Sequence, residues 1–147
     1  MYKSGVIYDK VEALYDKKNV AVQRDDKSIR LYDVTNSFSQ TKNFATTYSI
    51  RDYVQIGSLD TLAILTSNSL VVIKWIVFQQ IVLVSMDAQK IAPIGTSNEF
   101  MLIMKQIPGG TPGQLELVVF DLEEETVYES HPSTEGNSGL ALCSSPD

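Results

Sequence analysis

Histidine and cysteine, two side chains that often carry catalysis or bind metals, are scarce in this chain. It has one histidine, His131, and one cysteine, Cys143. Ser-His-Asp catalysis needs a histidine held in fixed geometry, whereas His131 precedes Pro132 in a polar segment of small residues. Zinc sites use several Cys or His ligands, and one of each does not make the usual set. We therefore predict that the protein is not an enzyme and that it holds no metal or cofactor.

Two loops have residues of functional types without the matching spacing. Residues 121–125, Asp-Leu-Glu-Glu-Glu, offer oxygen ligands but lack the Asp-x-Asp-x-Asp-Gly spacing of a calcium loop, so a solvated turn is the simpler interpretation. Residues 108–113, Pro-Gly-Gly-Thr-Pro-Gly, lack the Lys-Ser/Thr pair and the following helix of a phosphate loop. They predict a long hairpin loop, and such loops often bind partners.

A balanced run of charges, Arg24, Asp25, Asp26 and Lys27, separates two apolar segments. Such a run is typical of a solvent-exposed turn in a hairpin. Exposed turns also carry binding residues more often than the elements they connect. These four residues are therefore our candidate protein-binding site, and a plain solvated turn is the alternative.

The overall composition limits the class of partner. The chain has 147 residues, 44% of them hydrophobic, and a formal net charge of −6. This length and composition suffice for a folded core. The negative charge argues against a broad nucleic-acid surface, which needs a basic face. Because a lone cysteine cannot form an internal disulfide, we expect a reducing compartment and a cytoplasmic protein.

The long apolar run at residues 70–84 does not predict a membrane span. A spanning helix needs about 20 predominantly apolar residues, and this run is shorter and contains Lys74, Gln79 and Gln80. Its many Val and Ile residues favour buried strands. Trp75, at the end of such a strand, is expected in the core, with an interface anchor as the alternative.

Apolar and polar residues alternate in residues 28–34, which is the pattern of a strand with unlike faces. Together with the apolar run at 20–23 and the charged turn between them, this pattern predicts a hairpin. Short apolar runs bounded by turn residues continue along the chain, and no segment of ten or more residues shows helical periodicity. Strands are expected at residues 5–8, 11–15, 20–23, 28–34, 44–49, 51–56, 59–65, 69–75, 76–86, 88–94, 100–105, 115–122 and 127–129, with a polar loop at 35–42.

The predicted strands recur with a constant spacing. Residues 21–23 align with 63–65, and residues 29–31 align with 71–73, both at an offset of 42 residues. A chance match of hydrophobic runs need not give two strands the same offset. Units of about 40–45 residues with four strands each have the repeat length of propeller blades.

A looser third copy places Phe120-Asp121 88 residues after Tyr32-Asp33. An aromatic residue followed by Asp commonly ends the third strand of a WD-repeat blade, and residues 26–34 resemble that strand. The chain is therefore similar to the WD-repeat and related β-propeller families. Lys74-Trp75 fits the pattern only in part. The Gly-His pair that opens many WD blades is absent, and the sole histidine lies near the chain's end, so the His-to-Asp network of that family is not expected.

The resemblance, which covers about residues 5–129, implies a divergent propeller. The predicted fold is all-β, with about three propeller-type four-stranded antiparallel units. They form a single domain at 1–129, followed by a disordered polar tail at 130–147. Closed propellers typically have 4–8 blades, so three units imply an arc that other subunits or a second copy of the chain would complete. A β-sandwich or small barrel is the alternative fold.

The function expected from this resemblance is a non-enzymatic protein–protein interaction scaffold. It would be a propeller-like segment of a larger assembly, of the kind found in membrane trafficking. Exposed strand edges pair readily with other chains, so the expected partners are proteins, not nucleic acid. The alternative is a sandwich or barrel that binds a small ligand, or acts on it, in a pocket lined by several strands.

Overall fold

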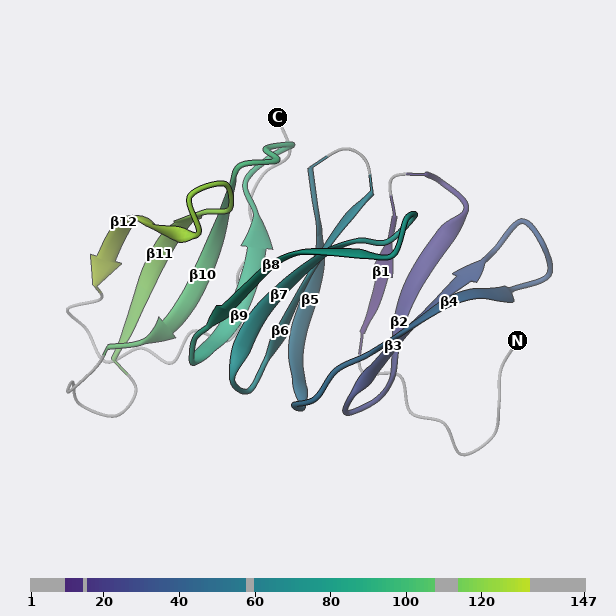
Figure 1. Ribbon diagram of the computed structural model, residues 1–147, viewed down its shortest axis with the longest axis horizontal. Helices are drawn as coiled ribbons and strands as arrows, with labels where there is room; N and C mark the ends of the chain where they lie inside the picture. Colours follow the sequence, from purple (N-terminus) through teal and green to yellow (C-terminus); the bar gives the residue numbers. More distant parts are fainter. Residues whose placement is uncertain (1–9, 15, 58–59, 108–113, 133–147) are drawn as a thin grey trace. The chain divides into compact units, whose positions relative to one another are not determined.

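The computed structural model describes residues 10–14, 16–57, 60–107 and 114–132. These residues form twelve β-strands and no helix (Figure 1). No helix long and apolar enough to cross a membrane is therefore found in the described part of the chain. The predicted strand at residues 5–8 and the predicted loop at 108–113 lie outside the described residues.

The first compact unit, Met1–Ile50, contains one antiparallel sheet. Each strand pairs with the next along the chain, in the order β1-β2-β3-β4. Alternating apolar residues give the middle strands a face to bury, and the charged residues between β2 and β3 supply the tight turn. The strands are β1 (Val11–Ala13), β2 (Asn19–Asp25), β3 (Ser28–Asp33) and β4 (Ser39–Ala45).

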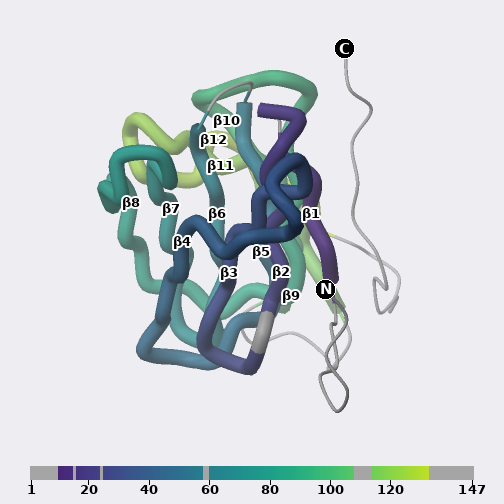
Figure 2. Tube along the Cα trace, turned by 90° about the vertical axis from the view of Figure 1, so that its right-hand side faces the viewer, coloured from purple at the N-terminus to yellow at the C-terminus, as the bar shows by residue number. Residues whose placement is uncertain are grey.

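The second compact unit, Arg51–Asp147, contains two sheets of the same kind, in the orders β5-β6-β7-β8 and β12-β11-β10-β9. Figure 2 shows three strands of the first of these sheets, β6, β7 and β8, as neighbours. The strands are β5 (Ile50–Ile56), β6 (Thr61–Thr66), β7 (Ser69–Lys74), β8 (Gln79–Ser85), β9 (Ala88–Pro93), β10 (Phe100–Gln106), β11 (Leu115–Asp121) and β12 (Thr126–Pro132).

The predicted fold class is confirmed. The protein is all-β, with three four-stranded antiparallel sheets. The apolar segments at 76–86 and 88–94 supply the outer strand of the second sheet and the first strand of the third, as expected. No described strand of one sheet pairs with another sheet, so the three sheets do not close into one barrel. The single domain expected at 1–129 stays a prediction.

Several strand boundaries differ from expectation; β8, for example, begins at Gln79 and not at Ile76. The clearest differences are on two outer strands, β4 and β12. The sequence predicts a loop at residues 39–42, but they form the first half of β4, where they pair with β3. It also predicts that the polar tail begins at Ser130, whereas β12 continues to Pro132 by pairing with β11. Outer strands are mostly exposed, so their sequences need no apolar alternation and are easily taken for loops. The rest of the predicted tail, 133–147, lies outside the described residues.

Equivalent backbone hydrogen bonds show which residues of the three sheets correspond. The amide of the residue after the third strand donates to the carbonyl of the residue before the second strand. The three bonds run from Val34 to Lys18 (2.7 Å), from Trp75 to Asp60 (2.8 Å) and from Leu122 to Glu99 (2.7 Å). The offset of 88 residues from the first copy to the third is therefore correct, because Val34 corresponds to Leu122.

The offset of 42 residues holds for one strand pair and is wrong for the other. Ala21 and Ala63 occupy the same place, 42 residues apart, but their cross-strand partners are Leu31 and Val72, which are 41 apart. The extra residue is in β2, where the register shifts between Gln23 and Asp25. This β-bulge lengthens the first hairpin by one residue.

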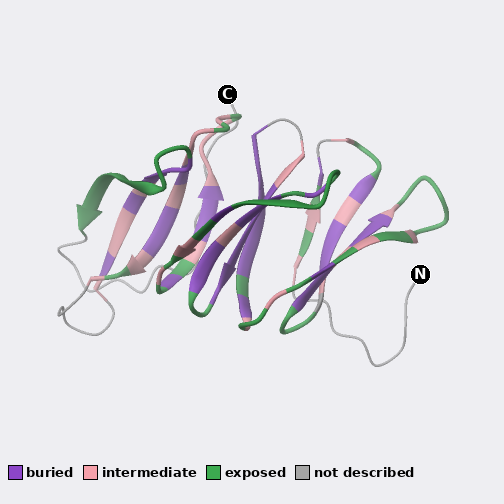
Figure 3. Ribbon diagram, in the orientation of Figure 1, coloured by how far each residue is buried: buried purple, intermediate pink, exposed green. Residues whose placement is uncertain are grey.

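The two sheets of the second unit pack face to face. Ala63, Leu65, Leu70 and Val72 of β6 and β7 have no exposed surface and belong to one apolar cluster with residues of β9–β11. The second and third strands of each sheet are accordingly mostly buried or partly buried, and the fourth strands, β8 and β12, are mostly exposed (Figure 3). Trp75 is buried with 4% of its surface exposed, which agrees with the prediction that it lies in the core.

Polar side chains link the first strands of these two sheets, β5 and β9, which do not pair with each other. Asp52 is buried, and its carboxylate accepts the amides of Tyr53 (2.9 Å) and Ile91 (3.1 Å). Arg51 donates to the Asp87 carboxylate and to the Ala88 carbonyl, both at 2.6 Å. These contacts fix the two strands relative to each other without a shared ladder.

Candidate protein-binding site

The charged turn predicted as a binding site connects β2 to β3. Asp25, Asp26 and Lys27 are exposed, and the structure describes no side chain for Arg24. Asp25 Oδ1 accepts the Lys27 amide at 2.9 Å, and this bond is the main reason why the pKa of Asp25 lies below its ordinary value. The turn is therefore available to a partner, and its role in binding stays a prediction.

The same turn also holds the chain that follows β4. The Lys27 carbonyl accepts the Thr46 amide (2.8 Å), and the Asp26 carbonyl accepts the Ile50 amide (2.7 Å). Asp26 Oδ2 accepts the Ser49 hydroxyl at 3.2 Å. A structural role thus explains much of the turn's hydrogen bonding.

The acidic run forms a turn between β11 and β12. Asp121 Oδ1 accepts the amides of Glu123 (2.9 Å) and Glu124 (3.0 Å), so it caps the turn. His131 lies on β12, exposed, with its ring nitrogen 3.0 Å from Glu129 Oε2. Within the described residues, no three His, Cys, Asp or Glu side chains are arranged to hold a metal ion.

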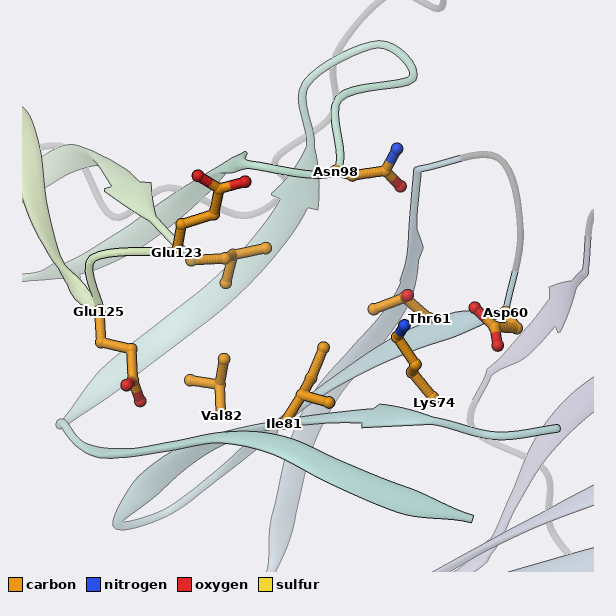
Figure 4. Close-up of a pocket in the computed structure, with 9 residues that line it drawn as sticks. Asp60, Thr61, Lys74, Ile81, Val82, Asn98, Glu123 and Glu125 are labelled. Atoms are coloured by element: carbon orange, nitrogen blue, oxygen red, sulfur yellow. The ribbon is translucent and has the colours of Figure 1, made fainter. Parts of the chain in front are cut away.

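A groove of about 540 Å³ lies between the two sheets of the second unit. The turns before β6 and β10, strands β6–β8 and the acidic turn after β11 all contribute to it. Figure 4 shows Glu123 and Glu125 on one side, and Lys74, Ile81 and Val82 on the other. The lining residues are Asp60, Thr61, Lys74, Ile81, Val82, Asn98, Leu122, Glu123 and Glu125.

A β-bulge directs two successive residues of β8 into this groove. Val72 pairs with Val82 and Ile73 pairs with Gln80, so Ile81 is the extra residue. The outer strands of the other sheets have the same bulge, at Thr41 and Tyr128. Bulges redirect side chains and are common next to functional sites.

In the first and third sheets the bulge residue contacts the first residue of the second strand, and in the second sheet the two equivalent residues line the groove. In the first sheet the Thr41 hydroxyl donates to Asn19 Oδ1 at 3.1 Å. In the third sheet Tyr128 contacts Phe100, with ring centroids 5.0 Å apart. In the second sheet Ile81 lines the groove together with Thr61.

The turn after the third strand is apolar in one sheet of the second unit and acidic in the other. After β7 it contains Ile76, Val77 and Phe78, which are 55%, 62% and 60% exposed. After β11 the corresponding residues are Glu123, Glu124 and Glu125. The backbone is alike, because Phe78 and Glu125 both have a positive φ, 58° and 56°. The acidic turn after β11 therefore forms one wall of the groove, whereas the corresponding turn after β7 is apolar.

Charged residues recur in each sheet at two equivalent places, directly before the second strand and at the end of the third. These pairs are Lys18 with Asp33, Asp60 with Lys74, and Glu99 with Asp121. The first two pairs combine opposite charges, whereas the third is acidic at both places. Burial raises the pKa of Glu99, and the negative charges of Asp121 and Glu123 raise it further. Negative charge is thus concentrated at the acidic turn.

A second surface lies on the sheet β9–β12. Its packed face, formed by Met101, Ile103, Val118 and Phe120, is buried against the sheet β5–β8. Its open face carries Leu102, Met104, Leu117 and Val119, which alternate with those residues along β10 and β11. No other described sheet of the second unit packs on the open face.

The open face corresponds, position by position, to a covered face of the preceding sheet. Leu102, Met104, Leu117 and Val119 occupy the places of Ala63, Leu65, Leu70 and Val72. The latter four have no exposed surface. On the open face only Met104 is buried, and the other three are partly exposed.

Neither surface could be identified from sequence alone. The groove brings together residues from 60 to 125 in the chain, and an offset wrong by one residue moves a strand's side chains to the other face. When the sheets are aligned by structure, the sequence shows that the turn after the third strand changes from apolar residues at 76–78 to acidic residues at 123–125. That signal could have pointed to the acidic wall.

No protein-family model and no curated protein matches this chain. Its fold is nevertheless common, since 352 chains of solved structures match it. One of them is hydrazine synthase from Kuenenia stuttgartiensis, with a TM-score of 0.70 and 11% sequence identity. The match covers 86% of this chain and 37% of that chain. At this identity the likeness shows the fold alone, and this chain spans little more than a third of its neighbour.

Proposed function

We propose that the protein is a non-enzymatic interaction module that works as a segment of a larger β-sheet assembly. The observation that supports this most is the open face of β9–β12. Apolar side chains occupy positions there that are fully buried in the preceding sheet. Removing such surface from water is favourable, and a further four-stranded sheet with side chains like those of the packed face would fit it.

Two other observations support the same proposal. Closed propellers have 4–8 blades, and the described residues of this chain form three four-stranded sheets. A solved structure with this fold extends well beyond the part that this chain matches. The WD-repeat resemblance favours scaffold and membrane-trafficking assemblies as the context, and the lone Cys143 favours the reducing environment of the cytoplasm.

Sedimentation velocity over a range of protein concentrations tests the proposal. Without its natural partner, the open face should draw copies of the chain together, so the apparent mass should rise above 16.3 kDa with concentration. Leu117→Glu should restore a monomer, because the charge would have to be desolvated in the contact. A wild-type chain that stays monomeric at every concentration contradicts the proposal.

A further inference from the structure

We propose that the groove of the second unit binds an extended protein segment that presents a lysine or arginine beside a bulky apolar side chain. This site is separate from the open face and from the charged turn at residues 24–27. Its occupant follows from two properties of the lining, its charge and its apolar floor.

The charge of the groove is complementary to a basic segment. Three carboxylates, Asp60, Glu123 and Glu125, line it against the single ammonium group of Lys74, which leaves a net charge of −2. The side chains of Glu123 and Glu125 form no ion pair with any residue that the structure describes. Glu99 and Asp121 add negative charge beside the same turn. A cationic side chain would therefore be attracted to this wall.

The apolar part of the groove favours a second contact, with an apolar side chain of the bound segment. Val82 and Leu122 are buried, and Ile81 is brought beside them by the bulge of β8 although 40% of its surface is exposed. An isoleucine at that exposed place is not required by the fold, because the equivalent residue of the first sheet is Thr41. The apolar contact is thus a feature of this groove.

The shape favours a peptide over a small metabolite. Small-molecule sites bury most of their ligand, whereas Lys74, Ile81, Asn98, Glu123 and Glu125 are all exposed. An extended chain that lies along the surface can place one side chain against Ile81 and Val82 and the next against the carboxylates. Alternation along a strand gives such neighbours different directions.

Fluorescence anisotropy with the full chain and a labelled peptide tests this site. The probe is an eight-residue peptide of alternating lysine and leucine, and the control peptide replaces lysine with glutamate. We expect the lysine peptide alone to bind, with an affinity that falls as salt is added. Equal binding of both peptides, or no binding of the lysine peptide, would overturn the proposal.

Matched variants separate the groove from general charge effects. Glu123→Lys and Glu125→Lys should each weaken binding about tenfold, as expected for charges at a contact. Glu124→Lys makes the same charge change on the same turn, but Glu124 does not line the groove, so binding should change little. Ile81→Thr, which introduces the residue found at the equivalent place of the first sheet, should weaken binding while circular dichroism shows an intact fold. Equal losses in all three lysine variants would refute the site.

This proposal does not depend on the proposed function. Leu117→Glu lies on the open face and should bind the peptide as the wild type does. If the wild type self-associates, and this variant stays monomeric and still binds the peptide, both proposals stand. If the wild type never self-associates but binds the peptide, only the function proposed for the open face fails.

Discussion

At the scale of single residues, the second unit depends on a few buried polar contacts. Asp52 bridges β5 and β9 because its two oxygens accept amides from both strands. The sequence gives no sign of this role, since an acidic residue within an apolar strand is usually a solvent-facing one. A carboxylate that replaces missing ladder bonds can be recognised only when the neighbouring strand is known.

We predict that Asp52→Ala destabilises the protein by about 1–3 kcal/mol, because the Ile91 amide would be left buried without an acceptor. Urea unfolding, followed by the fluorescence of buried Trp75, measures the loss. Asp87→Ala is the control, since the Asp87 side chain is 78% exposed and exposed ion pairs contribute little. Equal effects of the two changes would show that Asp52 is not a structural bridge.

The raised pKa of Glu99 predicts a pH dependence. Its cause is burial first and then the charges of Asp121 and Glu123. The folded state holds this proton more tightly than the unfolded state, so stability should fall as pH rises from the ordinary pKa of 4.5 through the higher folded pKa. Glu123→Gln should lower the Glu99 pKa in an NMR titration of its carboxyl carbon. A pKa that is unchanged or higher would contradict this account.

At the scale of elements, sequence patterns predicted the strands far better than their register. The third strand of each sheet was found because its apolar residues are buried, but the bulge at Arg24 made the alignment of β3 with β7 wrong by one residue. Outer strand β4 was missed in part because its exposed residues are polar. Both errors arise where tertiary pairing, not the local pattern, decides the structure.

Gly57 at the end of β5 offers a test of how the sheets of the second unit meet. Its φ is +70°, and a Cβ placed there would lie 1.7 Å from Asn98 Oδ1. We predict that Gly57→Ala costs about 1–3 kcal/mol from backbone strain alone, with the clash adding to it. Thermal unfolding monitored by circular dichroism should show a lower Tm.

The double variant separates the two causes. With Asn98→Ala in the background, Gly57→Ala should cost less, because only the strain from the positive φ remains. Additive effects of the two substitutions would mean that the side chain of Asn98 does not restrict this position.

At the scale of the whole molecule, equivalent positions in two sheets should respond differently to the same change. Leu70 and Leu117 occupy the same place, but only Leu70 is fully buried. Leu70→Asp should cost about 4 kcal/mol or more and unfold the unit, because it buries an unpaired charge. Leu117→Asp should cost only about 1–2 kcal/mol and leave the circular dichroism spectrum intact. Unfolding by both variants would mean that the face carrying Leu117 is already covered.

Self-association is the property that tests the central claim most directly. Sedimentation velocity of the wild-type chain and of Leu117→Glu, side by side at rising concentration, measures it. The open face predicts a mass that grows above 16.3 kDa for the wild type and stays at that value for the variant. A wild type that remains a monomer throughout, or a folded variant that associates equally well, would contradict the claim that this face receives another sheet.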